Sequence, residues 1–187
     1  MSNSRHIYCL EGNWNRSRNS GQSIKPVLDM LHHSCEVKYI YRKCNTKAEF
    51  LEGLRKFTFK RYANYTILYI AFHGRRNKIL VGGESVTLKE ISSVLNGRLS
   101  GVIVHFGCCS TLGTTQNNIS SFIERTRCAL VSGYAKDVDY VASSAFEMVY
   151  FEILQYCSKL HKIQQSICGR YSAFIDSLKF TVKSSVY

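Results

Sequence analysis

Two spacings of hydrophobic residues alternate along the 187-residue chain. Short apolar runs rich in β-branched and aromatic residues are typical of strands, and apolar residues three and four positions apart are typical of helices. The apolar runs predict strands at 6–10, 37–41, 65–72, 101–106 and 129–132, and a hairpin of 78–81 and 85–88 that turns at Gly82-Gly83. The helical spacing predicts helices at 24–33, 46–56, 89–95, 119–125, 141–160 and 163–178.

The order of these elements indicates the fold class. The runs at 65–72 and 101–106 are almost unbroken apolar stretches, which is typical of central strands covered on both faces. Alternating strands and helices favour a mostly parallel sheet between two helical layers. We therefore predict one α/β domain over residues 1–187, built as a three-layer α/β/α sandwich.

Side chains at particular helix positions add detail to this prediction. Asn45 or Thr46 is suited to cap the second helix, and Thr87 is suited to cap the third. The helix at 141–160 has the clearest apolar spacing of all. Its predicted inward stripe consists of Ala142, Ala145, Phe146, Val149, Ile153, Tyr156 and Leu160.

Composition and charge narrow the function classes. The formal net charge is +12, but the basic residues are spread along the chain without a nucleic-acid-binding motif. A solvated basic surface is therefore the ordinary interpretation, and an acidic substrate, an acidic partner or a phosphorylated ligand stays open. No apolar run approaches the roughly 20 residues that span a bilayer, and the start lacks a secretory signal. We expect a cytoplasmic protein that binds neither a membrane nor a specific nucleic acid.

The eight cysteines fit a reducing compartment better than a disulfide framework. No CxxC pair is present, and His32, His33 and Cys35 find no second cluster of ligands, so we interpret them as the end of a helix. No metal or organic cofactor is expected. Six cysteines are scattered and are expected to behave as small hydrophobic residues: Cys9, Cys35, Cys44, Cys128, Cys157 and Cys168.

Reactive residues follow two of the predicted central strands. The run 65–72 leads into His73-Gly74, and the run 101–106 leads into Gly107-Cys108-Cys109. The carboxyl ends of neighbouring parallel strands meet at one edge of a sheet, where ligands and catalytic groups gather. A thiolate beside an imidazole is a strong nucleophile, and glycine permits tight turns that leave backbone N–H groups free for an oxyanion. Neighbouring strand residues point to opposite faces, so only one of the two cysteines can meet His73. His105 lies inside the second strand, and we expect it to be packed rather than catalytic.

The ordered set of strand, His-Gly, hairpin, helix, strand and Cys resembles the caspase/hemoglobinase clan of cysteine peptidases, and most of all its CHAT branch. The segments VTLKEISSVLNGRLSGVIVHFGCCST and ALVSGYAKDVDYVASSAFEMVYFEIL carry the likeness. It extends over about 66–154, whereas the first 60 residues match only in the order of strand and helix. The resemblance implies that His73 is the general base and that the Gly74 amide helps to form the oxyanion hole. It favours Cys109 as the nucleophile, and a shift of one residue would select Cys108.

The resemblance also implies a function. It predicts a cysteine endopeptidase that acts on a protein or peptide substrate. In such small members this activity belongs to a regulated effector of prokaryotic defence or cell death, switched on by a regulatory protein or a nucleotide-derived activator. The alternative is a catalytically silent domain that senses a ligand or binds a protein. A nucleic-acid-binding domain ranks last, because it leaves the strand-end residues unexplained.

Substrate preference is open at this point. Glu11, Asp137 and Asp139 fall in regions that line the substrate pocket in this clan, and they would suit a substrate Lys or Arg. Arg75, Arg76 and Lys78 follow the histidine and would suit an acidic residue instead. For each of these six, ordinary solvated surface is the alternative.

Overall fold

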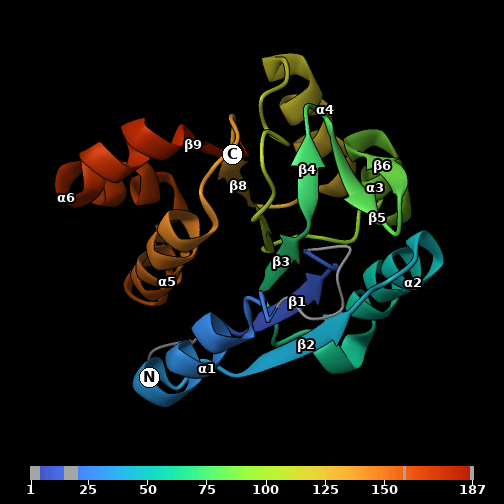
Figure 1. The fold of residues 1–187 in the computed structure, drawn as a ribbon, viewed down its shortest axis with the longest axis horizontal. Coiled ribbons are helices and arrows are strands. Elements are labelled where there is room, and N and C mark those ends of the chain that lie inside the picture. The colour runs from blue at the N-terminus through green and yellow to red at the C-terminus, as the bar shows by residue number, and fades with distance from the viewer. Residues whose placement is uncertain (1–4, 15–20, 158, 186–187) are drawn as a thin grey trace.

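A computed structural model describes residues 5–14, 21–157 and 159–185. Its centre is a six-stranded sheet in the order β2-β1-β3-β7-β8-β9 (Figure 1). Every neighbouring pair is parallel except β8 and β9, which run antiparallel. The strands are β1 (Ile7–Glu11), β2 (Tyr39–Lys43), β3 (Ile67–Ala71), β7 (Ile103–Phe106), β8 (Leu130–Tyr134) and β9 (Phe180–Ser184).

Helices cover both faces of this sheet. In Figure 1, α1, α5 and α6 lie on one side of the sheet and α2, α3 and α4 on the other. Two separate clusters of buried hydrophobic residues fill the spaces between the layers. The predicted three-layer α/β/α sandwich is therefore confirmed. The helices are α1 (Lys25–Cys35), α2 (Lys47–Phe57), α3 (Leu88–Val94), α4 (Gln116–Thr126), α5 (Tyr140–Tyr156) and α6 (Ile163–Leu178), with short 3-10 turns η1 (Lys60–Tyr62) and η2 (Leu160–Lys162).

A second, antiparallel sheet of three strands stands beside the central one. It contains β4 (His73–Arg75), β5 (Lys78–Val81) and β6 (Glu84–Thr87). The predicted hairpin is confirmed, and Gly82 and Gly83 form its turn with φ angles of 59° and 89°, which favour glycine. The sequence did not predict β4, whose His-Gly-Arg lacks an apolar signal, or β9.

The predicted helix caps are present. Thr46 accepts the Glu49 backbone N–H, and Thr87 accepts that of Glu90, while each glutamate reaches back to its capping residue. These capping boxes satisfy backbone donors that a helix start otherwise leaves open. The first of the two favours Thr46 over Asn45 as the cap of α2.

The predicted inward stripe of α5 is confirmed in part: Phe146 is buried, and Ala142, Ile153 and Leu160 are partly buried and pack against the same hydrophobic cluster, whereas Ala145 and Tyr156 are exposed. Tyr156 is 76% exposed, and the helix ends there instead of continuing to 160. The buried face contains Ser143, Phe146, Glu147, Tyr150, Phe151 and Leu154. Glu147 faces inward because its carboxylate binds the Tyr69 hydroxyl and the His105 ring beneath the helix. Apolar spacing alone does not predict a buried acidic residue.

No helix in the described part of the chain is both long and apolar enough to cross a membrane.

Candidate active site

The register of two adjacent parallel strands places the histidine and cysteine segments at one edge of the sheet. Ile70 of β3 pairs with Phe106 of β7. His73 therefore lies three residues after Ile70, just as Cys109 lies three residues after Phe106. The Gly107 N–H extends the ladder by donating to the Ile70 carbonyl at 3.0 Å. The strand pairing therefore confirms the expectation that the two segments emerge side by side.

Gly74 shows how closely the two segments pack. A Cβ atom built on Gly74 would lie 2.3 Å from the Cys109 carbonyl oxygen and 2.3 Å from Thr111 Oγ1. It would also lie 2.9 Å from Cys108 Cβ. Only glycine permits this approach, so the residue after His73 brings β4 directly against the cysteine loop.

The two cysteines have different surroundings. Cys108 is fully buried, donates its S–H to the Ile70 carbonyl at 3.0 Å and accepts the Phe72 N–H at 3.3 Å. Burial raises the pKa of the Cys108 thiol far above its usual range, which keeps it protonated and unreactive. Cys109 is partly exposed, and its Sγ lies 3.7 Å from the Val138 carbonyl oxygen. This geometry favours Cys109 over Cys108 as the reactive thiol.

The His73 ring is exposed and is held by Trp14. Its Nε2 donates a hydrogen bond to the Trp14 backbone carbonyl. A carbonyl can only accept, so Nε2 carries hydrogen and Nδ1 is the basic nitrogen of the neutral ring. The Trp14 indole also stands edge-on to His73 and to Tyr140, with ring centroids 5.5 Å apart in each case.

No hydrogen bond joins His73 and Cys109 in this structure. Each faces a backbone carbonyl instead, His73 that of Trp14 and Cys109 that of Val138. Catalytic hydrogen bonds are often loose without substrate and tighten when it binds. The arrangement is therefore a pair of candidate groups at one edge of the sheet, not an assembled dyad.

Glu11 supports Trp14 from below and is closed to a substrate. The side chain is fully buried, and it accepts hydrogen bonds from Trp14 Nε1 at 2.6 Å and from the Ile24 N–H at 2.7 Å. The hydroxyls of Ser23 and Tyr41 also donate to it. The expectation that Glu11 receives a substrate Lys or Arg does not fit this environment, because donors of the chain itself already surround the carboxylate. Glu11 instead holds the segment that carries Trp14 in position.

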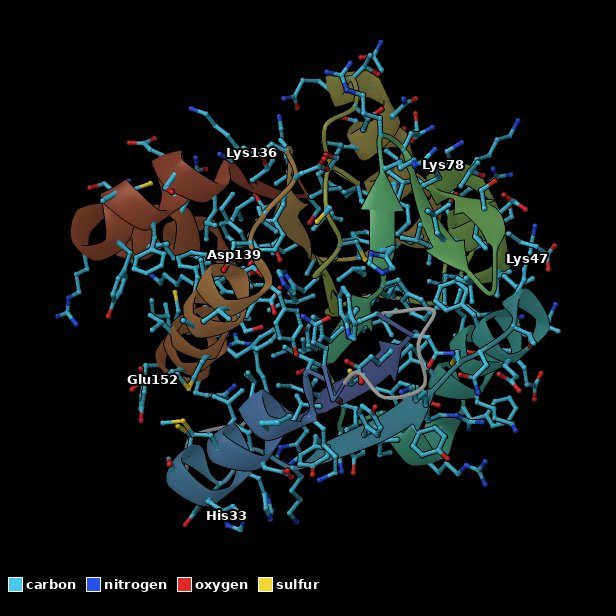
Figure 2. The ribbon with its side chains drawn as sticks, in the orientation of Figure 1. His33, Lys47, Lys78, Lys136, Asp139 and Glu152 are labelled. Carbon is cyan, nitrogen blue, oxygen red and sulfur yellow. The ribbon has the colours of Figure 1, made fainter. Side chains whose placement is uncertain are left out.

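The two candidate aspartates tie the cysteine loop to α5. Ser110, with a φ of 53°, donates its hydroxyl to Asp137 and its backbone N–H to the Lys136 carbonyl at 2.9 Å. Asp139 caps α5 by accepting the Ala142 N–H at 2.8 Å, and Figure 2 shows it at the start of that helix. Both carboxylates are exposed, but each accepts a hydrogen bond within the chain. Their contacts favour a role in shaping the loop around Cys109.

The basic residues near His73 have no such partners. Arg75 is exposed at the end of β4 and lies directly opposite Lys78 of β5. Within the described residues, the side chains of Arg75, Arg76 and Lys78 form neither an ion pair nor a hydrogen bond. Figure 2 shows Lys78 and Lys136 on either side of β4 in its view. Positive charge thus flanks the candidate site.

His105 is packed, as expected, in a polar network beneath the site. It is fully buried, with Nδ1 2.9 Å from Ser132 Oγ and Nε2 3.1 Å from Glu147 Oε1. Tyr69 and Tyr134 donate their hydroxyls to the same Glu147 carboxylate. A Cβ on Gly107 would meet Glu147 Oε1 at 2.8 Å, so the network reaches the start of the cysteine loop.

Sequence reasoning missed Trp14, Tyr140 and Glu147. Trp14 carried a signal, since it is the single tryptophan and follows the first strand within a turn. Glu147 carried none, because an acidic residue on a long helix is ordinarily solvated. His32 and His33 lie in the last turn of α1, and Cys35 ends that helix, as predicted. The described residues contain no group of three or more His, Cys, Asp or Glu side chains that would hold a metal ion.

Comparison with known sequences places the chain in a family. A sequence model described as a family of unknown function (DUF6642) matches residues 4–183. The chain belongs to the DUF6642 family. The match covers both sheets and all six α-helices of this DUF6642 member, including His73 and Cys109. No curated protein matches the chain.

Proposed function

We propose that this protein is a caspase-like cysteine endopeptidase that uses His73 and Cys109. One observation carries the proposal. The Gly74 backbone packs against the Cys109 carbonyl, so an exposed imidazole and a partly exposed thiol emerge together at the carboxyl edge of adjacent parallel strands. The resemblance to the CHAT branch of the caspase clan, carried by residues 66–154, supports the same reading.

The proposed reaction is acyl transfer through the thiol. His73 Nδ1 accepts the Cys109 proton, and the thiolate attacks the carbonyl carbon of the scissile peptide bond. Backbone N–H groups, that of Gly74 among them, stabilise the oxyanion. The imidazolium then gives its proton to the leaving amine as the C–N bond breaks. Water, deprotonated by His73, cleaves the thioester, which releases the acid product and restores the thiol.

The hydrogen bond from His73 to Trp14 supports this assignment of roles. In triads, a third group holds the histidine in the correct tautomer. The Trp14 carbonyl does this here by keeping hydrogen on Nε2, and Glu11 fixes Trp14 in turn. In this proposal the buried Glu11 carboxylate positions Trp14, and Trp14 in turn positions the base, His73.

We also propose that the enzyme is regulated. The Cys109 thiol faces the Val138 carbonyl, so it must leave that contact before it can give its proton to His73. Movement of the loop 135–139 by a regulatory protein or a nucleotide-derived activator would release it. The role as an effector of prokaryotic defence or cell death, acting in the cytoplasm, rests on the resemblance and on the eight free cysteines, which suit a reducing compartment.

A test of the activity is hydrolysis of a diverse peptide library by the wild type and by matched variants. Cys109→Ser and His73→Ala should lower turnover by about a thousandfold or more. Cys168→Ser removes an exposed thiol on α6 and should leave turnover unchanged. Full activity in Cys109→Ser would overturn the proposal. Absence of hydrolysis by the wild type, together with a Cys109 thiol no more reactive than Cys168, would overturn it as well.

A second candidate function is a catalytically silent domain that senses a ligand or binds a protein. The observation in its favour is that thiol and imidazole each bind a backbone carbonyl instead of one another. A silent domain needs no activated thiol, so the reactivity of Cys109 separates the two candidates.

A further inference from the structure

His73 belongs to the outer face of the three-stranded sheet. Side chains alternate between the two faces of a strand, and directly paired residues of antiparallel strands share a face. His73 and Arg75 are two residues apart on β4, and Arg75 pairs with Lys78 of β5. Ile79 and Val86 point the opposite way and are fully buried in the core. His73, Arg75 and Lys78 therefore share the face that is turned away from the core.

The charge on this face is unbalanced. Like charges directly opposite one another on a sheet are destabilising. Arg75 and Lys78 are opposed in this way, and neither side chain forms an ion pair or a hydrogen bond with a described residue. By the strand register, the other members of the face are Leu80, Ser85 and Thr87, none of them acidic. Glu90 accepts the Thr87 hydroxyl at this face but forms its ion pair with Lys47, so Arg75 and Lys78 have no counter-charge of their own among the described residues.

Unlike these cations, the acidic side chains around the site accept hydrogen bonds from other residues of the chain. Glu11 is buried under four donors, Asp137 accepts the Ser110 hydroxyl, and Asp139 caps α5. Lys136, whose backbone carbonyl accepts the Ser110 N–H at 2.9 Å, lies next to the cysteine loop, and its side chain forms no ion pair with a described residue. On the β4 side of the site, electrostatics thus favour an anionic group and disfavour a substrate lysine or arginine, whereas the Asp137 and Asp139 carboxylates lie on the α5 side.

From this arrangement we propose that Arg75 and Lys78 recognise an acidic residue of the substrate peptide, within about two residues of the cleaved bond. The inference rests on the proposed endopeptidase function. Arg75 stands about 7 Å along β4 from His73, at a strand rise of about 3.3 Å per residue. An extended peptide has the same rise, which sets the distance of the acidic residue from the reacting carbonyl. The planar guanidinium of Arg75 matches a carboxylate in a two-point hydrogen bond, and Lys78 adds a point charge beside it.

One experiment measures the charge of the site without requiring peptidase activity. Iodoacetate and iodoacetamide attack a thiol with the same carbon and the same leaving group, and differ only in the charge of the reagent. At low salt, a cation about 8 Å from the reagent carboxylate raises the iodoacetate rate by about two- to threefold. Arg75→Gln with Lys78→Gln should lower the ratio of iodoacetate to iodoacetamide rates at Cys109 by about fivefold. The iodoacetamide rate should fall by no more than about threefold, because the lost cations also stabilise the thiolate.

A matched control and a peptide assay complete the test. Lys60→Gln removes one exposed cation beyond the end of α2, at the amino edge of the sheet, and should leave the ratio unchanged. Peptides that differ only as Asp or Asn near the scissile bond should favour Asp by at least tenfold in kcat/KM, and Arg75→Glu should abolish that preference. Hydrolysis with a basic or neutral preference, and a ratio indifferent to Arg75 and Lys78, would overturn the inference and leave the endopeptidase standing. A fall of the iodoacetate to iodoacetamide ratio in the double variant, in a protein that hydrolyses no peptide and whose Cys109 reacts no faster than Cys168, would support the anionic preference and reject the proposed function.

Discussion

Gly74→Ala tests the contact on which the candidate site depends. The added Cβ would stand 2.3 Å from the Cys109 carbonyl oxygen, whereas a carbon and an oxygen ordinarily approach no closer than about 3.3 Å. The strand and the cysteine loop would have to separate by about 1 Å. The obstacle is backbone, so a change of side-chain rotamer does not relieve it. Thr111 Oγ1, also at 2.3 Å, stands in the way as well.

The expected effect on the chemistry is large. A misplacement of about 1 Å between reacting groups lowers a rate by roughly a hundredfold. Overpacking of this kind also lowers the free energy of unfolding by about 1–3 kcal/mol, which leaves a folded protein to assay. Peptide hydrolysis and the rate of iodoacetamide labelling at Cys109 both report the displacement. Urea unfolding, measured in parallel, confirms that the variant is folded.

Gly169→Ala is the matched control for this substitution. Gly169 lies inside α6, and a Cβ there would meet nothing within 4 Å. The control should keep wild-type rates and gain about 0.5–1 kcal/mol in the free energy of unfolding, because alanine favours a helix. Wild-type labelling and hydrolysis in folded Gly74→Ala would refute the reasoning, since the two segments would then not need their close approach.

Three further predictions concern residues around and away from the site. Cys108→Ser keeps a donor and an acceptor in the buried position, so it should leave Cys109 labelling unchanged and cost about 1 kcal/mol of stability in urea unfolding; loss of labelling in the folded variant would contradict the choice of Cys109. Glu11→Ala leaves several buried donors without an acceptor and should lower stability by about 3 kcal/mol, whereas Glu11→Gln should lose clearly less, and equal losses in thermal unfolding would count against the network. The hydrogen bond from Lys47, aided by the helix cap, lowers the pKa of Glu90 from 4.5 to about 2. The stabilisation by Glu90 is therefore full above pH 4.5 and disappears as the pH falls toward 2. The difference in the free energy of unfolding between wild type and Glu90→Gln should follow that pH dependence and stay under about 1 kcal/mol, because the pair is exposed. A difference that is independent of pH would contradict the assignment to Glu90.

The sequence predicts most of this fold because its strands and helices carry strong local signals. The apolar runs before His73 and Gly107 are buried on both faces, and such runs identify central parallel strands. Helix starts at Thr46 and Thr87 were predictable from capping chemistry. These features depend on neighbouring residues in the chain, which is why one sequence reveals them.

The features that could not be predicted depend on contacts distant in sequence. The rotation of α5 follows from Glu147, whose partners lie 42 and 78 residues away. The carbonyl that holds His73 comes from a residue 59 positions earlier. Glu11 looked like a substrate ligand by its position after a strand, and its burial depends on Ser23, Ile24 and Tyr41. Periodicity describes one element at a time, so it identifies the residues at the sheet edge but not how they pair.

The central claim, that His73 activates Cys109, is tested most directly by covalent labelling with iodoacetamide near neutral pH, with each labelled cysteine identified by peptide mass mapping. The exposed Cys168 is an internal reference for an ordinary thiol. A free thiol is only a few per cent ionised at pH 7, so an activated Cys109 should react about tenfold faster than Cys168. In His73→Ala, Cys109 should fall to the rate of Cys168, while Cys168 stays unchanged. Labelling of Cys109 that is no faster than that of Cys168, or that is unaffected by the loss of His73, would contradict the claim.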